Sequence, residues 1–204
     1  ETATSMAIGK NMEATYVANL LLKTSIAVGK DMGLNDVVKS VAAGITAGAV
    51  GAGMEALKAV SGQIVETAVS NTLDVSAIVQ SAAAGAISVA SKENATAIAE
   101  ATAAGAVGAI GTGDKKTAMA VAQAATAGIL ASASENNLDA IGLATAAANH
   151  AAQEGKLNIT VVKETGSDSD SKDDKLTIGF GKKDGKVEVL QFDNTNKEPT
   201  TEVV

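Results

Sequence analysis

The chain has 204 residues and a formal net charge of −7, with 16 basic residues against 23 acidic ones. All of the basic residues are lysines, and the chain contains neither cysteine nor tryptophan. Disulfide frameworks and thiolate zinc sites are therefore excluded. Nucleic acid is not an expected partner either, because phosphate binding needs clustered basic residues and single strands need aromatic stacking platforms.

The apolar residues are mostly small. Only Tyr16, Phe180 and Phe192 are aromatic, so a core must be built from alanine, valine, isoleucine and leucine. Each of these side chains buries little area, so stability must come from many close contacts. A chain rich in Ala, Gly, Ser and Thr and free of Arg, Trp and Cys is typical of a protein made in bulk and exported. We therefore expect it outside the cell or at the cell surface.

Targeting and membrane signals are weak. Residues 1–30 contain no basic start followed by an apolar run and a cleavage site. The chain begins at Glu1 without methionine, so we expect any leader to have been removed already. The uncharged stretches 40–54, 75–91 and 117–134 are dominated by Ala, Gly, Ser and Thr, so they predict no membrane span and a membrane is not an expected partner.

The first predicted element covers residues 4–30, as one long helix or two short ones. Leu20, Leu21 and Leu22 are its most apolar point. Three consecutive leucines cannot all face one stripe of a helix. We therefore expect this element either to lie centrally in the core or to contact another subunit through these leucines.

A motif of small residues, glycine and an apolar residue then recurs about every 20 residues, as in SVAAGITAG, QSAAAGAIS, EATAAGAVG and QAATAGILA. Each copy has the length of one helix plus one turn. Candidate N-cap residues precede several of the apolar stretches. These are Asn35 with Asp36, Asn71 with Thr72, Asn94 with Thr96, and Asn137 with Asp139. The pattern predicts an array of short antiparallel helices over residues 1–155.

Glycine within a helix costs about 1 kcal/mol relative to alanine, so its recurrence needs a compensating gain. The gain we infer is close approach of neighbouring helices, with contacts between their backbones. The predicted packing seam consists of Gly44, Gly48, Gly62, Gly85, Gly105, Gly108 and Gly128. Two alternatives stay open for these glycines: a phosphate loop, although GAVGAIG lacks the full G-x-G-x-x-G pattern and a preceding strand, and a glycine zipper acting in membranes.

The pattern changes at residue 156. The runs 157–164, 175–183 and 186–192 are rich in β-branched and aromatic residues, and Asp184-Gly185 is a strong hairpin signal. Residues 156–194 therefore predict a small antiparallel β element, as a hairpin or a three-stranded meander covered by the helices. We expect Leu176, Ile178 and Phe180 on one face, opposed by Val187, Val189 or Phe192. The break in alternation between Val189 and Leu190 predicts either a bulge or a sheet contacted on both sides.

Residues 195–204 form a polar tail that follows the β element and contains the only proline. One expectation is a tail without a fixed partner. The other is that TTEVV pairs with the edge strand of a neighbouring copy, because unpaired edges are templates for another chain. Under the second expectation, Val203 and Val204 are subunit contacts.

Candidate chemistry is sparse. Calcium is the one cofactor the sequence suggests, through Asp168, Asp170, Asp173 and Asp174. Their spacing matches only the start of a calcium loop, and a solvated loop is the alternative. His150 is the only histidine, so it predicts a surface residue or a pH-sensitive contact rather than a multi-histidine metal site. We find no catalytic constellation and expect neither enzyme activity nor a small-molecule substrate.

Two short stretches, TSMAIGKNMEAT near the start and AQAAT at 122–126, resemble the R-body ribbon proteins of bacteria. That family consists of small alanine-rich helical proteins that assemble into coiled ribbons, so the resemblance implies self-assembly. The chain departs from the family in lacking a glutamine run and in having a β segment.

Together these features predict a mainly α fold with a small C-terminal β element. The function we expect is structural: a subunit that assembles with copies of itself into an extracellular filament, pilus-like fibre or surface layer. Close packing of small residues and C-terminal β contacts would hold the assembly together. The alternatives are a membrane-active, toxin-like protein that uses its glycine-rich helices, and a monomeric adhesion or binding module.

Overall fold

The computed structural model describes residues 13–29, 34–164, 174–183, 186–193 and 199–203. In these residues, seven helices precede four strands. The helices are α2 (Ala14–Gly29), α3 (Leu34–Val50), α4 (Met54–Ser70), α5 (Val75–Ser88), α6 (Ala95–Ile110), α7 (Lys115–Glu135) and α8 (Ala140–Gly155). The expected fold class, mainly α with a small C-terminal β element, is confirmed.

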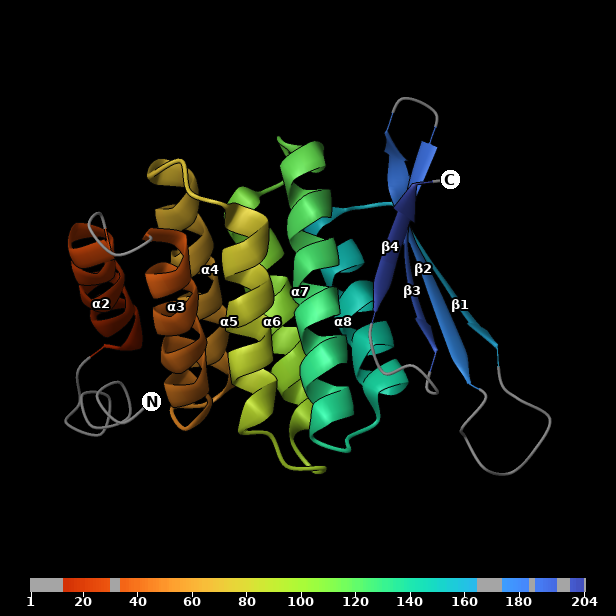
Figure 1. The fold of residues 1–204 in the computed structure, drawn as a ribbon, viewed down its shortest axis with the longest axis horizontal. Helices are drawn as coiled ribbons and strands as arrows, with labels where there is room; N and C mark the ends of the chain where they lie inside the picture. The colour runs from red at the N-terminus through yellow and green to blue at the C-terminus, as the bar shows by residue number, and fades with distance from the viewer. Residues whose placement is uncertain (1–12, 30–33, 165–173, 184–185, 194–198, 204) are drawn as a thin grey trace.

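The helices form two layers (Figure 1). Helices α3, α5 and α7 make one layer, and α4, α6 and α8 make the other. Successive helices run in opposite directions and alternate between the two layers. Helices that pack side by side within a layer are therefore second neighbours along the chain. Helix α2 packs on α3 and α4 at one end of the array, and the sheet lies at the other end.

Aspartates begin three of the helices. Asp74, Asp114 and Asp139 are the N-caps of α5, α7 and α8, and each carboxylate accepts a hydrogen bond from the backbone N–H three residues later, at 2.9–3.0 Å. Each bond satisfies an amide that the first helical turn leaves free. The expected cap at Asn71 with Thr72 is wrong: Asn71 ends α4, and Thr72 takes a left-handed φ of 51°.

Three helices end in the same kind of turn. Thr72, Asn137 and Lys156 have φ values of 51°, 54° and 50°, and each is followed by a leucine. The leucine N–H donates back to a carbonyl of the last helical turn, as in a Schellman motif. These bonds run from Leu73 to Ala68, from Leu138 to Ala133 and from Leu157 to Ala152, at 3.0, 2.9 and 2.9 Å.

The strands form one antiparallel sheet in the order β1-β2-β3-β4. They are β1 (Ile159–Glu164), β2 (Lys175–Lys183), β3 (Lys186–Asp193) and β4 (Thr200–Val203). Lys183 pairs with Lys186, as a two-residue Asp-Gly connection requires, although residues 184 and 185 themselves lie outside the described residues. Strand β4 comes from the segment we expected to be a tail, and it pairs with β3 of its own chain.

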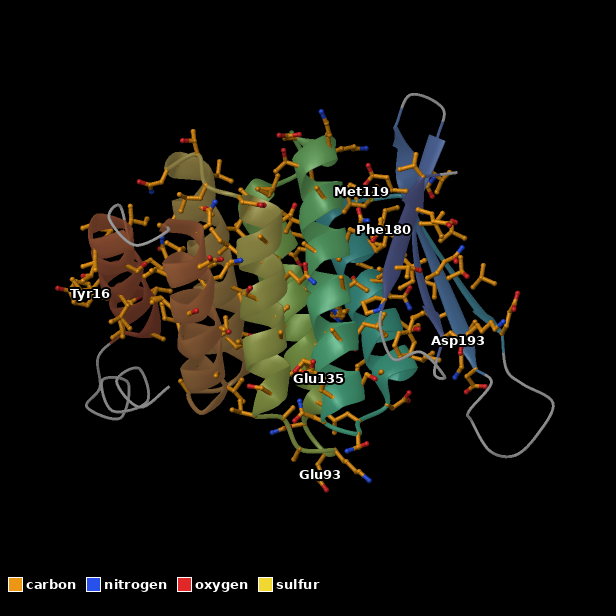
Figure 2. All side chains as sticks on the ribbon, viewed as in Figure 1. Tyr16, Glu93, Met119, Glu135, Phe180 and Asp193 are labelled. Atoms are coloured by element: carbon orange, nitrogen blue, oxygen red, sulfur yellow. The ribbon has the colours of Figure 1, made fainter. Side chains whose placement is uncertain are left out.

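The helix-facing side of the sheet carries Leu176, Ile178 and Phe180, all almost fully buried. Phe192 lies opposite Leu176, and Leu190 lies opposite Ile178. Val187 and Val189 are therefore not the opposing residues on this face, because they belong to the other side of β3. The face packs on α7 and α8, where Figure 2 shows Met119 of α7 beside Phe180.

The irregularity of the sheet lies in β2. The register shifts between Phe180 and Lys182, around Gly181, which has a φ of +60°. The register stays regular at Val189 and Leu190, so a bulge at that point is wrong. Both residues are buried although they face opposite sides of β3.

Candidate assembly surfaces

The glycine-rich helices contact each other inside the chain. A Cβ atom on Gly85 of α5 would overlap the backbone of Ala43 in α3, and one on Gly128 of α7 would overlap the backbone of Gln80 in α5. In the other layer, a Cβ on Gly105 of α6 would overlap the backbone of Lys58 in α4. These three glycines therefore pack helices of the same layer together, and their small surfaces are already covered within one copy.

Two other seam glycines, Gly62 and Gly108, are in looser places. A Cβ on Gly62 would lie 3.2 Å from the carbonyl oxygen of Gly105, and one on Gly108 would lie 3.2 Å from Oε1 of Glu154. Gly44 is half-buried and Gly48 is buried, both in α3. Among the five seam glycines compared by an added Cβ, close approach is thus strongest at Gly85, Gly105 and Gly128.

Hydroxyl groups add contacts that the sequence did not predict. Thr46 Oγ1 of α3 donates to the carbonyl oxygen of Ala82 in α5 at 2.6 Å. Ser132 Oγ of α7 donates to the carbonyl oxygen of Ala84 in α5 at 3.0 Å. Both bonds join helices of one layer, and they are possible because small side chains bring the backbones close together. Their only signal in the sequence is a hydroxyl residue near each glycine motif.

One ion pair crosses a whole helix. Lys58 Nζ of α4 lies 3.2 Å from Glu154 Oε2 of α8, and α6 runs between these two helices. Gly108 of α6 leaves room for the Glu154 side chain. Both charged side chains are about two-fifths exposed, at 41% and 37%, so the pair contributes little to stability. The pair does show that the side chains of α6 are small on this side of the array, because Lys58 and Glu154 meet across it.

The first end surface is the outward side of α2. Tyr16, Leu20 and Val28 are 60%, 52% and 54% exposed, and their spacing by multiples of four places them on one stripe of the helix, together with the exposed Thr24. Figure 2 shows Tyr16 pointing away from the rest of the array. The three consecutive leucines point in different directions around the helix. Leu20 is exposed, Leu21 is half-buried against the core, and Leu22 is buried.

The second end surface is the sheet. Its outermost strands are β1 and β4, and no further described strand pairs with the free side of either. Val162 of β1 and Val203 of β4 are 47% and 57% exposed. All four residues of β4 are exposed. Val204, the other expected contact of the tail, lies outside the described residues.

The acidic segment carries no described metal site. Asp168, Asp170 and Asp173 lie outside the described residues, and Asp174 is half-buried just before β2. Across the ranges that the structure covers, no group of three or more acidic or histidine side chains is placed to hold a metal. His150 Nε2 of α8 lies 3.7 Å from Glu100 Oε2 of α6, so the histidine faces a carboxylate in the neighbouring helix.

Among the described helices, α7 is long and apolar enough to cross a membrane by length and composition. It packs between α5 and α8 and is mostly buried there. Comparisons of the chain with protein-family models, with curated proteins and with solved structures found no significant match.

Proposed function

We propose that the chain is a structural protein that assembles with copies of itself into an extracellular filament, pilus-like fibre or surface layer. One observation carries this proposal: among the described residues, the two ends of the helical array are unlike, and each presents a surface that another copy can cover. One end exposes Tyr16, Leu20 and Val28 of α2, and the other presents a sheet whose outermost strands, β1 and β4, each pair with one described strand only.

The physical argument comes from repeat proteins. An array of repeats stays soluble as a single particle when its terminal elements have a polar outer face, whereas α2 exposes three large apolar side chains. Two different surfaces that meet head to tail generate an open polymer rather than a closed dimer, and the opposite edges of the sheet, β1 and β4, are two such surfaces. The seam glycines Gly85, Gly105 and Gly128 are covered within the chain, so we place the contacts between copies at the end surfaces.

Negative-stain electron microscopy of the purified protein tests the proposal, together with sedimentation over a range of concentrations. We expect filaments or sheets without any added ligand, and a sedimentation coefficient that rises with concentration. A monomer at every concentration would overturn the proposal. Dye leakage from liposomes, measured on the same sample, separates assembly from a membrane-active function, for which leakage at low protein concentration is the expected sign.

A further inference from the structure

The two edges of the sheet are complementary in direction. The sheet contains four strands in chain order, each antiparallel to its neighbours, so β1 and β4 run in opposite directions. When identical copies are placed edge to edge in the same orientation, β4 of one copy therefore lies antiparallel to β1 of the next. A sheet with an even number of antiparallel strands can continue in this way from copy to copy.

The residues of the edges agree with such a junction. Strand β1 has the sequence ITVVKE, rich in β-branched residues, and its register with β2 is regular throughout. Because β1 and β4 each pair on one side only among the described strands, the backbone N–H and C=O groups of their other side can pair with another strand. Charged groups are few: Lys163 and Glu164 at the end of β1, and Glu202 in β4.

We propose that β4 of one copy pairs with β1 of a second copy, so that the sheets of successive copies join into one continuous antiparallel spine. This inference rests on the proposed function and names the contact that produces the polymer. The pairs β1·β2, β2·β3 and β3·β4 place Val161 and Val203 on the helix-facing side, and Val162 and Glu202 on the other side. One register thus sets Val203 opposite Val161 and Glu202 opposite Val162. It matches an apolar pair and brings no like charges opposite each other.

The geometry leaves room for the helices. Strands lie about 4.8 Å apart, so four strands give each copy an axial rise of about 19 Å. Neighbouring strands are rotated by about 20–25°, so successive copies turn by about 80–100° around the spine. Each helical array extends away from its own sheet (Figure 1). The arrays therefore radiate from the spine in different directions instead of overlapping.

Cysteine cross-linking tests this contact directly, because the chain contains no cysteine. We would prepare Val162→Cys, Glu202→Cys and the double variant, and treat them with a short bis-maleimide. The cross-linker should be long enough to join the two cysteines also when β4 and β1 pair in an adjacent register. The expected result is a ladder of covalent multimers from the double variant, and a covalent dimer from an equal mixture of the two single variants. Each single variant alone should stay mainly monomeric on a denaturing gel. A double variant of Val162→Cys with Lys92→Cys, an exposed position in the α5–α6 loop, is the control for random collision.

Two outcomes overturn the edge contact while leaving self-assembly intact. The first is filaments by electron microscopy but no ladder above the control. The second is efficient dimers from either single variant, which would mean that like edges pair. Absence of filaments in the parent protein contradicts the proposed function itself, so the two failures are distinguishable.

A charged edge gives an independent measurement. Lysine on an edge strand opposes pairing with another chain, so Val162→Lys should abolish filaments at a concentration where the parent protein forms them. Val69→Lys makes the same change at a valine that is similarly exposed, 45% against 47%, at the end of α4, and should leave filaments unchanged. Equal assembly of both variants would contradict the edge contact. Fibre diffraction of the parent should show a meridional reflection near 4.8 Å.

Discussion

Three helical glycines, Gly85, Gly105 and Gly128, lie directly against the backbone of a neighbouring helix. Gly105→Ala replaces a helical glycine by a better helix former, a gain of about 1 kcal/mol, but its Cβ meets the backbone of Lys58. Backbone cannot move aside as a flexible side chain can, so overpacking should dominate, and we expect a net loss of about 1–3 kcal/mol in the free energy of unfolding. Urea denaturation followed by circular dichroism measures it.

The control for this substitution is Gly113→Ala, at a position with nothing within 4 Å and an ordinary φ. It should change the free energy of unfolding by less than about 0.5 kcal/mol. Gly62→Ala, with its nearest atom at 3.2 Å, should fall between the two. If all three substitutions behaved alike, close backbone contact would not be the role of glycine in this array.

Asp114 links the start of α7 to pH. The Thr117 hydroxyl and backbone N–H donate to its carboxylate and hold the pKa of Asp114 below its usual value of 3.8. A lowered pKa in the folded state means that the carboxylate stabilises the fold at neutral pH, and this contribution is lost as the pH falls through that pKa. We expect the melting temperature to fall below about pH 4, and to fall less steeply in Asp114→Asn. Parallel melting curves of the two proteins between pH 7 and pH 3 would contradict this role.

At the scale of single elements, the ends of helices show where a substitution can add stability. Thr72 has a left-handed φ of 51°, which costs a residue with a Cβ about 1–2 kcal/mol and costs glycine almost nothing. Thr72→Gly should therefore raise the free energy of unfolding by up to about 1 kcal/mol, since glycine also loses more freedom on folding. Asn137→Gly should gain less, because asparagine tolerates this conformation better. Chemical denaturation of both variants checks the order.

The elements themselves could largely be predicted from local patterns. Apolar periodicity and small-residue motifs predicted the helices, and β-branched runs with Asp-Gly predicted β2 and β3. What failed depended on local turn chemistry or on partners distant in sequence. Asn71 resembles an N-cap, but the Schellman turn at Thr72 moves the cap to Asp74. Strand β4 has a polar, exposed sequence, and only its pairing with β3 makes it a strand.

The candidate surfaces were predictable only in part, for the same reason. The glycine motif indicates close packing, but it does not indicate that α5 packs on α3 rather than on α4, its neighbour along the chain. Leu20, Leu21 and Leu22 predicted either a central place in the core or a contact with another subunit, whereas their burial shows one helix at the end of the array with Leu22 buried and Leu20 exposed. The open edges of the sheet depend on strand order, which the local sequence does not determine.

At the scale of the whole molecule, the helical arrays radiating from a spine would end in α2. Its stripe of Tyr16, Leu20 and Val28 would then lie at the outside of each filament. Apolar surface exposed at regular intervals favours lateral association of filaments. Leu20→Lys places a charge in the middle of this stripe without removing a buried contact. It should leave the free energy of unfolding within about 0.5 kcal/mol of the parent and give thinner, separate filaments in electron micrographs.

Gln80→Lys adds the same charge at an exposed site on α5 and should leave filament width unchanged. Bundles of equal width in both variants would mean that α2 does not mediate contacts between filaments, whereas loss of the filaments themselves in Leu20→Lys would place α2, rather than the sheet edge, in the contact that builds the polymer.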